Sequence, residues 1–286
     1  MPDGRENRAA TPRRNLWLLL HGADAAAPSR GCPPARVVLL HGWLQTHSCW
    51  LETATALRDA YGHDVLLLDF VPDTMGIEGW MAQLTERIAA IGWDEGLPLS
   101  IAGCSLGAAV ASRYAAASPE RVARLTMVAP PGLPEPWYMP CHPVRNFAKL
   151  VCAAAPEAKC VANLHVIHQT PEYGMPLDTL FANVESGTLR LAVYVAEMDI
   201  IHRPRIEFWR KAEARAAKVG KPGGSLRVTM LPGRTHWGVC TGLFELGLQH
   251  EEALWHPSTE LTRDQREPLA APELVGTTNS APRSRL

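Results

Sequence analysis

The stretch "PLSIAGCSLGAAVASRYAAASPERV", residues 98–122, joins an apolar run to an alanine-rich segment through a short turn. The run Leu97–Ala102 has the length and composition of a buried strand. The segment Ser105–Ala117 predicts a helix that ends near Ser118-Pro119, because the residue before a proline disfavours helical backbone. Between them, residues 103–107 read Gly-Cys-Ser-Leu-Gly and match Gly-x-Ser-x-Gly. That pattern is weak alone, but a strand before it and a helix after it make it specific for a nucleophile turn.

The chemistry of this turn explains its glycines. A sharp strand-to-helix corner lifts the hydroxyl of Ser105 above the sheet edge and strains the backbone of that serine. A Cβ atom at Gly103 or Gly107 would collide with the neighbouring strand or helix. We therefore interpret Ser105 as a candidate nucleophile rather than an ordinary turn residue.

Short apolar runs alternate with helix-like segments along the chain. Strands that are apolar along their whole length and alternate with helices are typical of a parallel sheet covered on both faces. We therefore expect an α/β fold with a mostly parallel central sheet. The expected strands are Leu16–Leu20, Arg36–Leu40, Val65–Asp69, Leu97–Ala102, Arg124–Val128, Leu189–Ala196 and Ser225–Leu231. The expected helices are Trp50–Tyr61, Glu78–Ile91, Ser105–Ala117, Arg205–Val219 and a terminal one through Gly238–Trp255.

The strict alternation lapses over residues 131–188, where prolines and aromatic residues appear in mixed order. We interpret this segment as a small cap insertion in a single domain that spans residues 15–252. The polar start, residues 1–14, and the tail, residues 256–286, have few large apolar residues and are expected to be disordered.

Composition excludes several functional classes. The 286 residues carry a formal net charge of −1, which provides no electrostatic footprint for nucleic acid or an anionic membrane. No apolar segment approaches the roughly twenty residues that span a bilayer, and Leu16–Leu20 is too short for a signal peptide. Seven cysteines without a CxxC pair favour free thiols in a cytoplasm-like compartment. Cys141-His142 is the only adjacent Cys/His pair, so we expect no metal and no cofactor.

A serine nucleophile needs an acid and a histidine, each in a loop after a later strand. The stretch "LAVYVAEMDIIHRP" ends a strand with Glu197, Asp199 and His202. We favour Asp199 as the acid, because an acid a few residues past the strand end lies in the loop that must reach the imidazole. The stretch "LRVTMLPGRTHWGVC" places His236 just past the last strand, where a general base must lie, and an imidazole suits proton transfer near neutral pH.

Backbone donors for an oxyanion are expected at two places. The N–H of Leu106 lies at the positive end of the helix that follows the serine. In "VVLLHGWLQ" the chain leaves a strand through His41-Gly42, and the N–H of Trp43 can point to the same place. We expect His41 itself to be a structural hydrogen-bonding residue.

The four stretches "VVLLHGW", "IAGCSLGAA", "YVAEMDIIHRP" and "LPGRTHWGV" together resemble the α/β-hydrolase superfamily over roughly Leu16 to Gln249. The resemblance is greatest to its esterase, thioesterase and monoacylglycerol-lipase-like branches. It implies a Ser105–His236–Asp199 triad, an oxyanion hole at Trp43 and Leu106, and a variable cap over the cleft. One departure is "FVPDTMGIEGW" after Asp69, where many relatives carry a glycine-rich turn.

The function expected from these residues is hydrolysis of a carboxylic ester or thioester of small size through an acyl-serine, with no cofactor. Three alternatives stay open: a carbon–carbon bond hydrolase, an acyltransferase, and a binding or receptor module that kept the triad but not turnover. A redox role for Cys104 is the least favoured alternative, because a residue on the buried side of such a turn is usually inert. Acyl chain length, alcohol and oligomeric state are left open.

Overall fold

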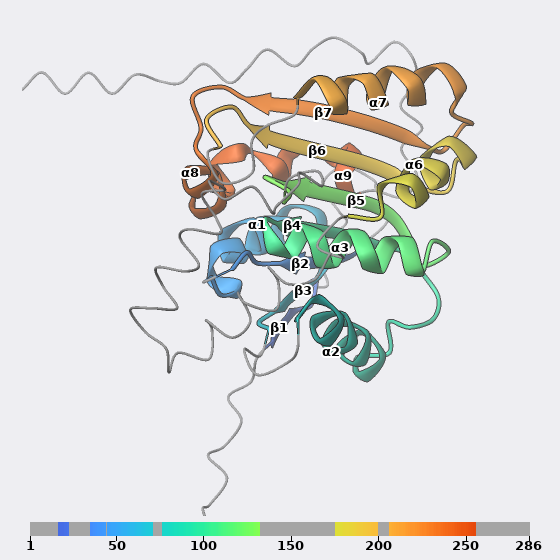
Figure 1. Ribbon diagram of the computed structural model, residues 1–286. Helices are drawn as coiled ribbons and strands as arrows, with labels where there is room; N and C mark the ends of the chain where they lie inside the picture. Colours follow the sequence, from blue (N-terminus) through green and yellow to red (C-terminus); the bar gives the residue numbers. More distant parts are fainter. Residues whose placement is uncertain are drawn as a thin grey trace, which may run out of the picture.

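The computed structural model describes residues 17–22, 35–43, 45–70, 76–131, 175–199 and 206–255. Within these ranges, seven strands form one sheet in the order β1-β3-β2-β4-β5-β6-β7 (Figure 1). All neighbouring pairs are parallel except β1 with β3, which is antiparallel. The strands are β1 Trp17–Leu20, β2 Arg36–Leu40, β3 Asp64–Leu68, β4 Leu99–Cys104, β5 Val122–Val128, β6 Arg190–Ala196 and β7 Ser225–Leu231.

Helices cover both faces of this sheet, as the apolar strands predict. The α-helices are α1 Leu51–Tyr61, α2 Gly76–Ala90, α3 Leu106–Ala117, α6 Leu177–Ser186, α7 Ile206–Val219, α8 His236–Thr241 and α9 Glu252–Trp255. Short 3-10 helices are η1 His47–Trp50, η3 Phe244–Leu246 and η4 Leu248–His250. The expected α/β architecture is thereby confirmed.

Alternate side chains of each strand enter two separate cores. On β2, Val38 and Leu40 pack with residues of α2, α3, α6 and α7, whereas Val37 and Leu39 pack with α1, α8 and α9. All four side chains are buried, because successive residues of a strand point to opposite faces and both faces are covered.

The prediction of one terminal helix after β7 is wrong. In place of one helix over Gly238–Trp255, the chain forms α8, two 3-10 turns and α9. Gly242 follows α8 with non-helical backbone, and Gly247 has φ +67°, in the left-handed region. The left-handed conformation of Gly247 ends the first 3-10 turn, because glycine adopts such backbone without a steric penalty, and at Gly242 the chain leaves the helical conformation of α8. The broken path brings Trp255 back under the sheet, where its carbonyl accepts a hydrogen bond from the hydroxyl of Ser100 on β4.

The helix α6 lies within the segment that the sequence suggests is a cap. Its Leu180 and Val184 are buried in the core shared with α3 and α7, so this part of the segment belongs to a covering layer of the sheet. The remainder of the suggested cap, residues 132–174, lies outside the described residues, as do the two expected disordered ends.

Candidate active site

The turn after β4 holds Ser105 in a strained conformation. Ser105 has φ +51° and ψ −116°, which a residue with a side chain rarely adopts. Its N–H donates to the carbonyl of Val128, while its own carbonyl accepts from the N–H groups of Ala108 and Ala109 in α3. Hydrogen bonds on both sides therefore fix this backbone between β5 and the first turn of α3.

Both glycines of the turn are sterically required, as the sequence predicts. A Cβ atom on Gly103 would lie 2.2 Å from the carbonyl oxygen of Gly107, and one on Gly107 would lie 2.4 Å from the carbonyl oxygen of Leu40. These are backbone atoms in a helix and in strand β2, and they cannot move aside without disturbing the fold. The close packing of β2, β4 and α3 thus depends on the missing side chains.

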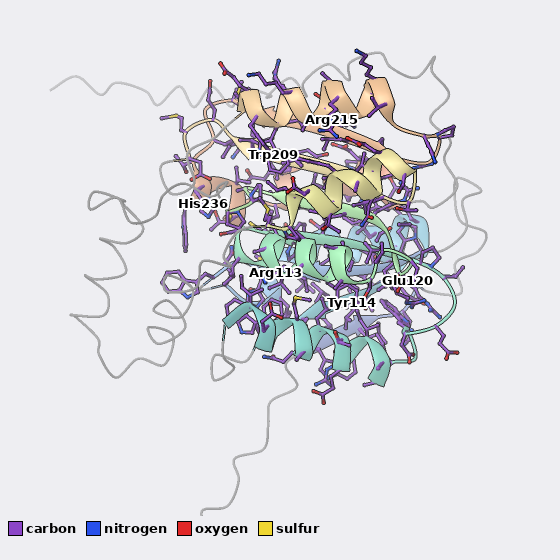
Figure 2. The ribbon with its side chains drawn as sticks, turned by 45° about the vertical axis from the view of Figure 1, so that its right-hand side comes forward. Arg113, Tyr114, Glu120, Trp209, Arg215 and His236 are labelled. Atoms are coloured by element: carbon purple, nitrogen blue, oxygen red, sulfur yellow. The ribbon has the colours of Figure 1, made fainter. Side chains whose placement is uncertain are left out.

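Two other predicted site residues meet Ser105 at the carboxyl ends of the strands. His236, the first residue of α8, follows β7, and Asp199 follows β6. The arrowheads of β5, β6 and β7 point toward the side on which α8 lies (Figure 1). In Figure 2 His236 lies at this end of the sheet, away from Glu120 on the opposite side.

The three side chains form a continuous hydrogen-bonded chain. The Nε2 atom of His236 lies 3.0 Å from the Ser105 hydroxyl, and its Nδ1 atom lies 2.7 Å from Oδ2 of Asp199. A carboxylate only accepts, so Nδ1–H donates to Asp199 and Nε2 is left to accept from the serine. All three residues are less than a tenth exposed. The arrangement has the geometry of a nucleophile, a base and an orienting acid.

The other acid considered at this position, Glu197, is placed differently. Its exposed carboxylate accepts a hydrogen bond from the N–H of Gly233 at 2.7 Å and stabilises the turn before α8. His202, on the same stretch, lies outside the described residues.

The electrostatics of His236 depend on Asp199 and on a cysteine. Burial alone lowers the pKa of His236, but its hydrogen bond to Asp199 and its contact with the thiol of Cys240 raise the pKa above its usual 6.5. The Sγ atom of Cys240 lies 3.8 Å from Nε2 of His236. The site therefore stabilises the protonated form of the His236 imidazole.

The loop after β2 runs against the nucleophile turn. A Cβ atom on Gly42 would lie 3.3 Å from Cβ of Ser105, so the two segments are in direct contact. Trp43 follows Gly42 in this loop. Leu106 begins α3, so its N–H has no carbonyl one turn earlier in the helix to accept it. Both of the expected oxyanion donors thus belong to segments that adjoin Ser105.

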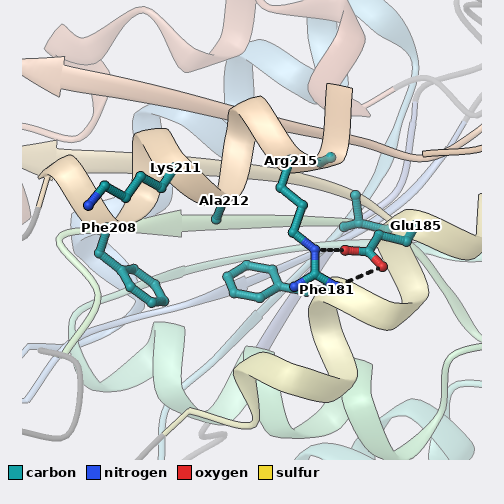
Figure 3. Close-up of a pocket in the computed structure, with 8 residues that line it drawn as sticks. Phe181, Glu185, Phe208, Lys211, Ala212 and Arg215 are labelled. Atoms are coloured by element: carbon teal, nitrogen blue, oxygen red, sulfur yellow. Dashed lines mark hydrogen bonds and ion pairs between the residues drawn. The ribbon is translucent and has the colours of Figure 1, made fainter. Parts of the chain in front are cut away.

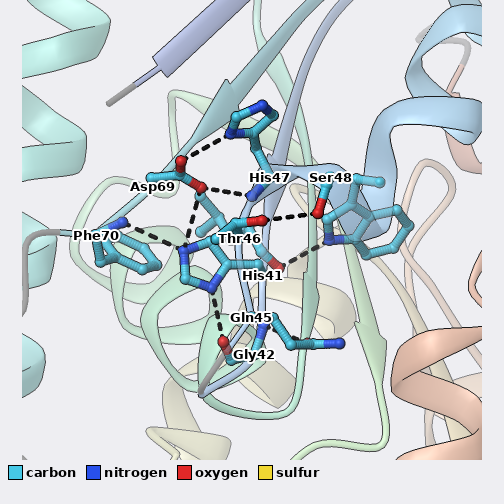
Figure 4. A network of polar contacts seen from close by, with 10 residues as sticks. His41, Gly42, Gln45, Thr46, His47, Ser48, Asp69 and Phe70 are labelled. Atoms are coloured by element: carbon cyan, nitrogen blue, oxygen red, sulfur yellow. Dashed lines mark hydrogen bonds and ion pairs between the residues drawn. The ribbon is translucent and has the colours of Figure 1, made fainter. Parts of the chain in front are cut away.

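A polar network holds this loop in place (Figure 4). The Nδ1–H of His41 donates to the carbonyl of Gly42 at 2.6 Å, and its Nε2 accepts from the N–H of Phe70 at 3.3 Å. Burial lowers the pKa of His41, which keeps the imidazole neutral in these two roles. Asp69, the residue directly after β3, accepts from the N–H and the Nδ1–H of His47. His41 is therefore a structural residue of the loop.

Two residues next to the site were missed by the sequence reasoning. The amide oxygen of Gln45 accepts from the N–H of Gly42 at 2.9 Å, and its NH₂ group donates to the carbonyl of Cys240 at 2.6 Å. Gln45 thus ties the loop after β2 to the helix that carries His236. For Cys240 a signal was available, because it lies four residues after His236 and hence one helical turn along.

A separate cavity of about 200 Å³ lies between α6 and α7 (Figure 3). Phe181, Phe208 and Ala212 contribute apolar surface to it, and an ion pair between Arg215 and Glu185 borders it. None of the three hydrogen-bonded site residues lines this cavity.

No group of three or more His, Cys, Asp or Glu side chains within the described ranges could hold a metal ion. Among the same residues, every helix is too short or too polar to cross a bilayer.

Comparison with known proteins agrees with the observed fold. A model of the alpha/beta hydrolase family matches residues 37–276. A search of curated protein sequences finds no significant match. A similar solved structure is a carboxylesterase of Nitrososphaera gargenis, with 14% identity and a TM-score of 0.58, where the match covers 83% of this chain and 94% of that one. A thermophilic esterase of Thermogutta terrifontis has 16% identity and a TM-score of 0.55, and the match covers 83% of this chain and 92% of that one. A thioesterase domain of the curacin biosynthetic pathway has 17% identity and a TM-score of 0.50, and the match covers 82% of this chain and 93% of that one. At these identities the likeness shows the fold.

Proposed function

Because the chain belongs to the alpha/beta hydrolase family, we propose that it is a serine hydrolase that cleaves a carboxylic ester or thioester through an acyl-serine. The observation that carries this proposal is the position of His236 between the other two residues. Its two ring nitrogens lie within hydrogen-bond distance of the Ser105 hydroxyl and of the Asp199 carboxylate.

The first half of the reaction follows from these contacts. His236 takes the proton of the Ser105 hydroxyl through Nε2 as the oxygen attacks the substrate carbonyl. Asp199 keeps Nδ1 protonated and stabilises the imidazolium that forms. The imidazolium then gives its proton to the leaving alcohol or thiol, and Ser105 retains the acyl group. Water repeats the same steps on the acyl-serine and releases the acid.

The negative charge on the substrate oxygen requires donors near Ser105. We assign this role to the N–H groups of Leu106 and Trp43. Leu106 lies at the N-terminus of α3, where the helix dipole favours negative charge. Each such donor contributes on the order of 3 kcal/mol to the transition state. The network of His41, Asp69 and Gln45 holds the loop that carries Trp43 and so acts by positioning.

Two exposed apolar side chains adjoin the triad in sequence and support an apolar substrate. Met198 is 56% exposed and precedes Asp199, and Trp237 is 55% exposed and follows His236. Apolar side chains that are exposed beside an active site are available to contact an apolar part of a substrate. The aromatic residues 137, 138 and 147 of the suggested cap lie outside the described residues.

The proposal is tested with Ser105→Ala in the full chain. Turnover of short p-nitrophenyl esters should fall by roughly 10⁶-fold, and stoichiometric labelling by a fluorophosphonate should disappear. Ser112→Ala is the matched control, because Ser112 is a buried serine of α3 whose hydroxyl donates only to the carbonyl of Ala109. This control should keep both activity and labelling.

Other outcomes distinguish the remaining functions. Full ester turnover by Ser105→Ala would remove the serine from its role. A wild-type chain that neither reacts with the fluorophosphonate nor hydrolyses esters would indicate a binding module. Labelling without ester hydrolysis would favour a carbon–carbon bond hydrolase or an acyltransferase, which use the same residues on other substrates.

A further inference from the structure

Two cysteines far apart in the sequence meet beside the triad. Cys104 ends β4 immediately before Ser105, and Cys240 lies in α8 one turn after His236. Their sulfur atoms are 2.6 Å apart, across 136 positions of sequence. Carbon atoms, which are smaller than sulfur, lie about 3.5–4.0 Å apart when not bonded. A sulfur–sulfur bond is about 2.05 Å long, so the two thiols need to approach by only about half an ångström to join.

The surroundings give the two sulfurs different chemistry. Cys240 accepts a hydrogen bond from the Cys104 thiol and contacts Nε2 of His236, and both interactions lower the pKa of the Cys240 thiol. Burial raises the pKa of Cys104 well above its usual value. Burial therefore keeps Cys104 in the unreactive thiol form, as the sequence predicts for a residue on the buried side of this turn, whereas the Cys240 sulfur has more of the reactive thiolate form.

The structure also provides a matched reference thiol. Cys49, in η1, is partly buried, and burial raises its pKa to about 12. Cys240 lies near enough to raise the pKa of Cys49 electrostatically, but within the described residues no second cysteine sulfur is hydrogen-bonded to Cys49. Proximity to the site without a sulfur partner makes Cys49 a control for non-specific oxidation.

We propose that Cys104 and Cys240 are a dithiol–disulfide pair, which a small hydroperoxide oxidises and a dithiol reductant reduces by thiol–disulfide exchange. The disulfide joins the nucleophile turn to the helix that carries His236. The Cys240 thiolate attacks one oxygen of hydrogen peroxide, the O–O bond breaks, and hydroxide leaves, so that Cys240 becomes a sulfenic acid. The hydroxide takes up the proton that the Cys240 thiol had released and becomes water. The Cys104 sulfur attacks the sulfenic sulfur, and its proton and the hydroxide that departs from that sulfur form a second water. In sum, two thiols and one peroxide give one disulfide and two waters, with two electrons passing from the sulfurs to the peroxide.

The disulfide also changes the pKa of His236, and the effect of this change on activity rests on the proposed function. His236 faces Asp199 from the loop after β6, Ser105 from the turn after β4, and Cys240 from its own helix. Closure moves the sulfurs little, so the triad is kept. In the disulfide, the Cys240 sulfur presents neither a proton nor a negative charge to Nε2. The pKa of His236 is therefore lower than in the reduced protein, and its neutral imidazole accepts the proton of Ser105 at a lower pH.

The linkage is tested on the full chain without reference to activity. The reduced protein is treated with hydrogen peroxide, blocked with iodoacetamide, digested without reductant and analysed by mass spectrometry. The expected product links the peptides of Cys104 and Cys240, has lost two hydrogens, and separates with dithiothreitol. Cys49→Ala should form it as the parent chain does, and Cys104→Ala and Cys240→Ala should not. Recovery of both cysteines in the alkylated form, or pairing of Cys240 with another cysteine, would overturn the proposal.

The effect on the base is measured by fluorophosphonate labelling at pH 6. The linked form should label Ser105 several-fold faster than the reduced form. Equal rates would overturn the effect on His236 while the linkage stands. If neither form is labelled, the proposed hydrolase function fails, and the mass-spectrometric result still decides the dithiol pair.

Discussion

Replacement of Asp199 by Asn tests the assignment of the acid most directly. The side chain keeps its shape but loses its negative charge, at a position whose exposed fraction is 4%. Its Oδ2 atom is 2.7 Å from Nδ1 of His236. An amide NH₂ group facing Nδ1 would force the proton onto Nε2, which could then no longer accept from Ser105. An amide oxygen facing Nδ1–H would preserve that bond but leave the imidazolium without its charged partner.

Either arrangement weakens the transition state. The comparable change in the serine-protease triad costs about 10⁴-fold in kcat, which corresponds to about 5.4 kcal/mol. We expect a loss of this size in the hydrolysis of a short p-nitrophenyl ester. Circular dichroism should show an unchanged fold, because the substitution removes no volume.

Glu197→Gln is the matched control. It makes the same chemical change two residues away, where the exposed carboxylate accepts only a backbone N–H in the part of the chain that the structure describes. Surface substitutions usually alter the free energy of unfolding by less than about 0.5 kcal/mol. The activity of Glu197→Gln should therefore stay within about twofold of the parent. The reasoning is refuted if folded Asp199→Asn keeps a tenth or more of the activity, or if Glu197→Gln loses as much.

The remaining predictions concern the base, the loop and the turn. Cys240→Ala removes a contact that raises the pKa of His236. The acid limb of the pH profile of kcat/KM should therefore move to lower pH, whereas Cys49→Ala should leave that limb in place. A shift of the acid limb to higher pH in Cys240→Ala would contradict this reasoning. Gln45→Ala removes both hydrogen bonds that link Gly42 to α8. The value of kcat should fall about tenfold with KM nearly unchanged, which corresponds to about 0.7 kcal/mol for each bond. An unchanged kcat would show that the loop needs no such link. Gly107→Ala places a Cβ atom 2.4 Å from the carbonyl oxygen of Leu40 and should lower the free energy of unfolding in urea by about 3 kcal/mol. Gly233→Ala, at φ +63° with open space around it, should cost only about 1 kcal/mol; similar losses in both would argue against a steric cause.

The sheet could be predicted from the sequence because its strands are buried on both faces. Ser225–Leu231 has the predicted bounds, and Arg36–Leu40 also agrees. The end of the chain could not be predicted in the same way. Apolar residues between 238 and 255 have a spacing compatible with a helix, but Gly242 and Gly247 end it, and the path between them is set by packing under the sheet.

The candidate site shows a similar division. The order of serine, acid and histidine, each after a strand, is a local pattern that the residues carry themselves. The contacts of Gln45 and Cys104 with Cys240 join positions 195 and 136 residues apart. No local pattern predicts such contacts, because they depend on how α8 lies over the strand ends.

The strained backbone of Ser105 also bears on how such a protein can change. A left-handed conformation with a side chain costs on the order of 1–3 kcal/mol, and glycine at this position would be released from most of that penalty. Selection for thermal robustness alone would therefore favour loss of the very hydroxyl on which turnover is proposed to depend. In a library of variants screened only for folding, serine at position 105 should therefore be depleted, because the residue proposed for catalysis is not the most stable one at this position.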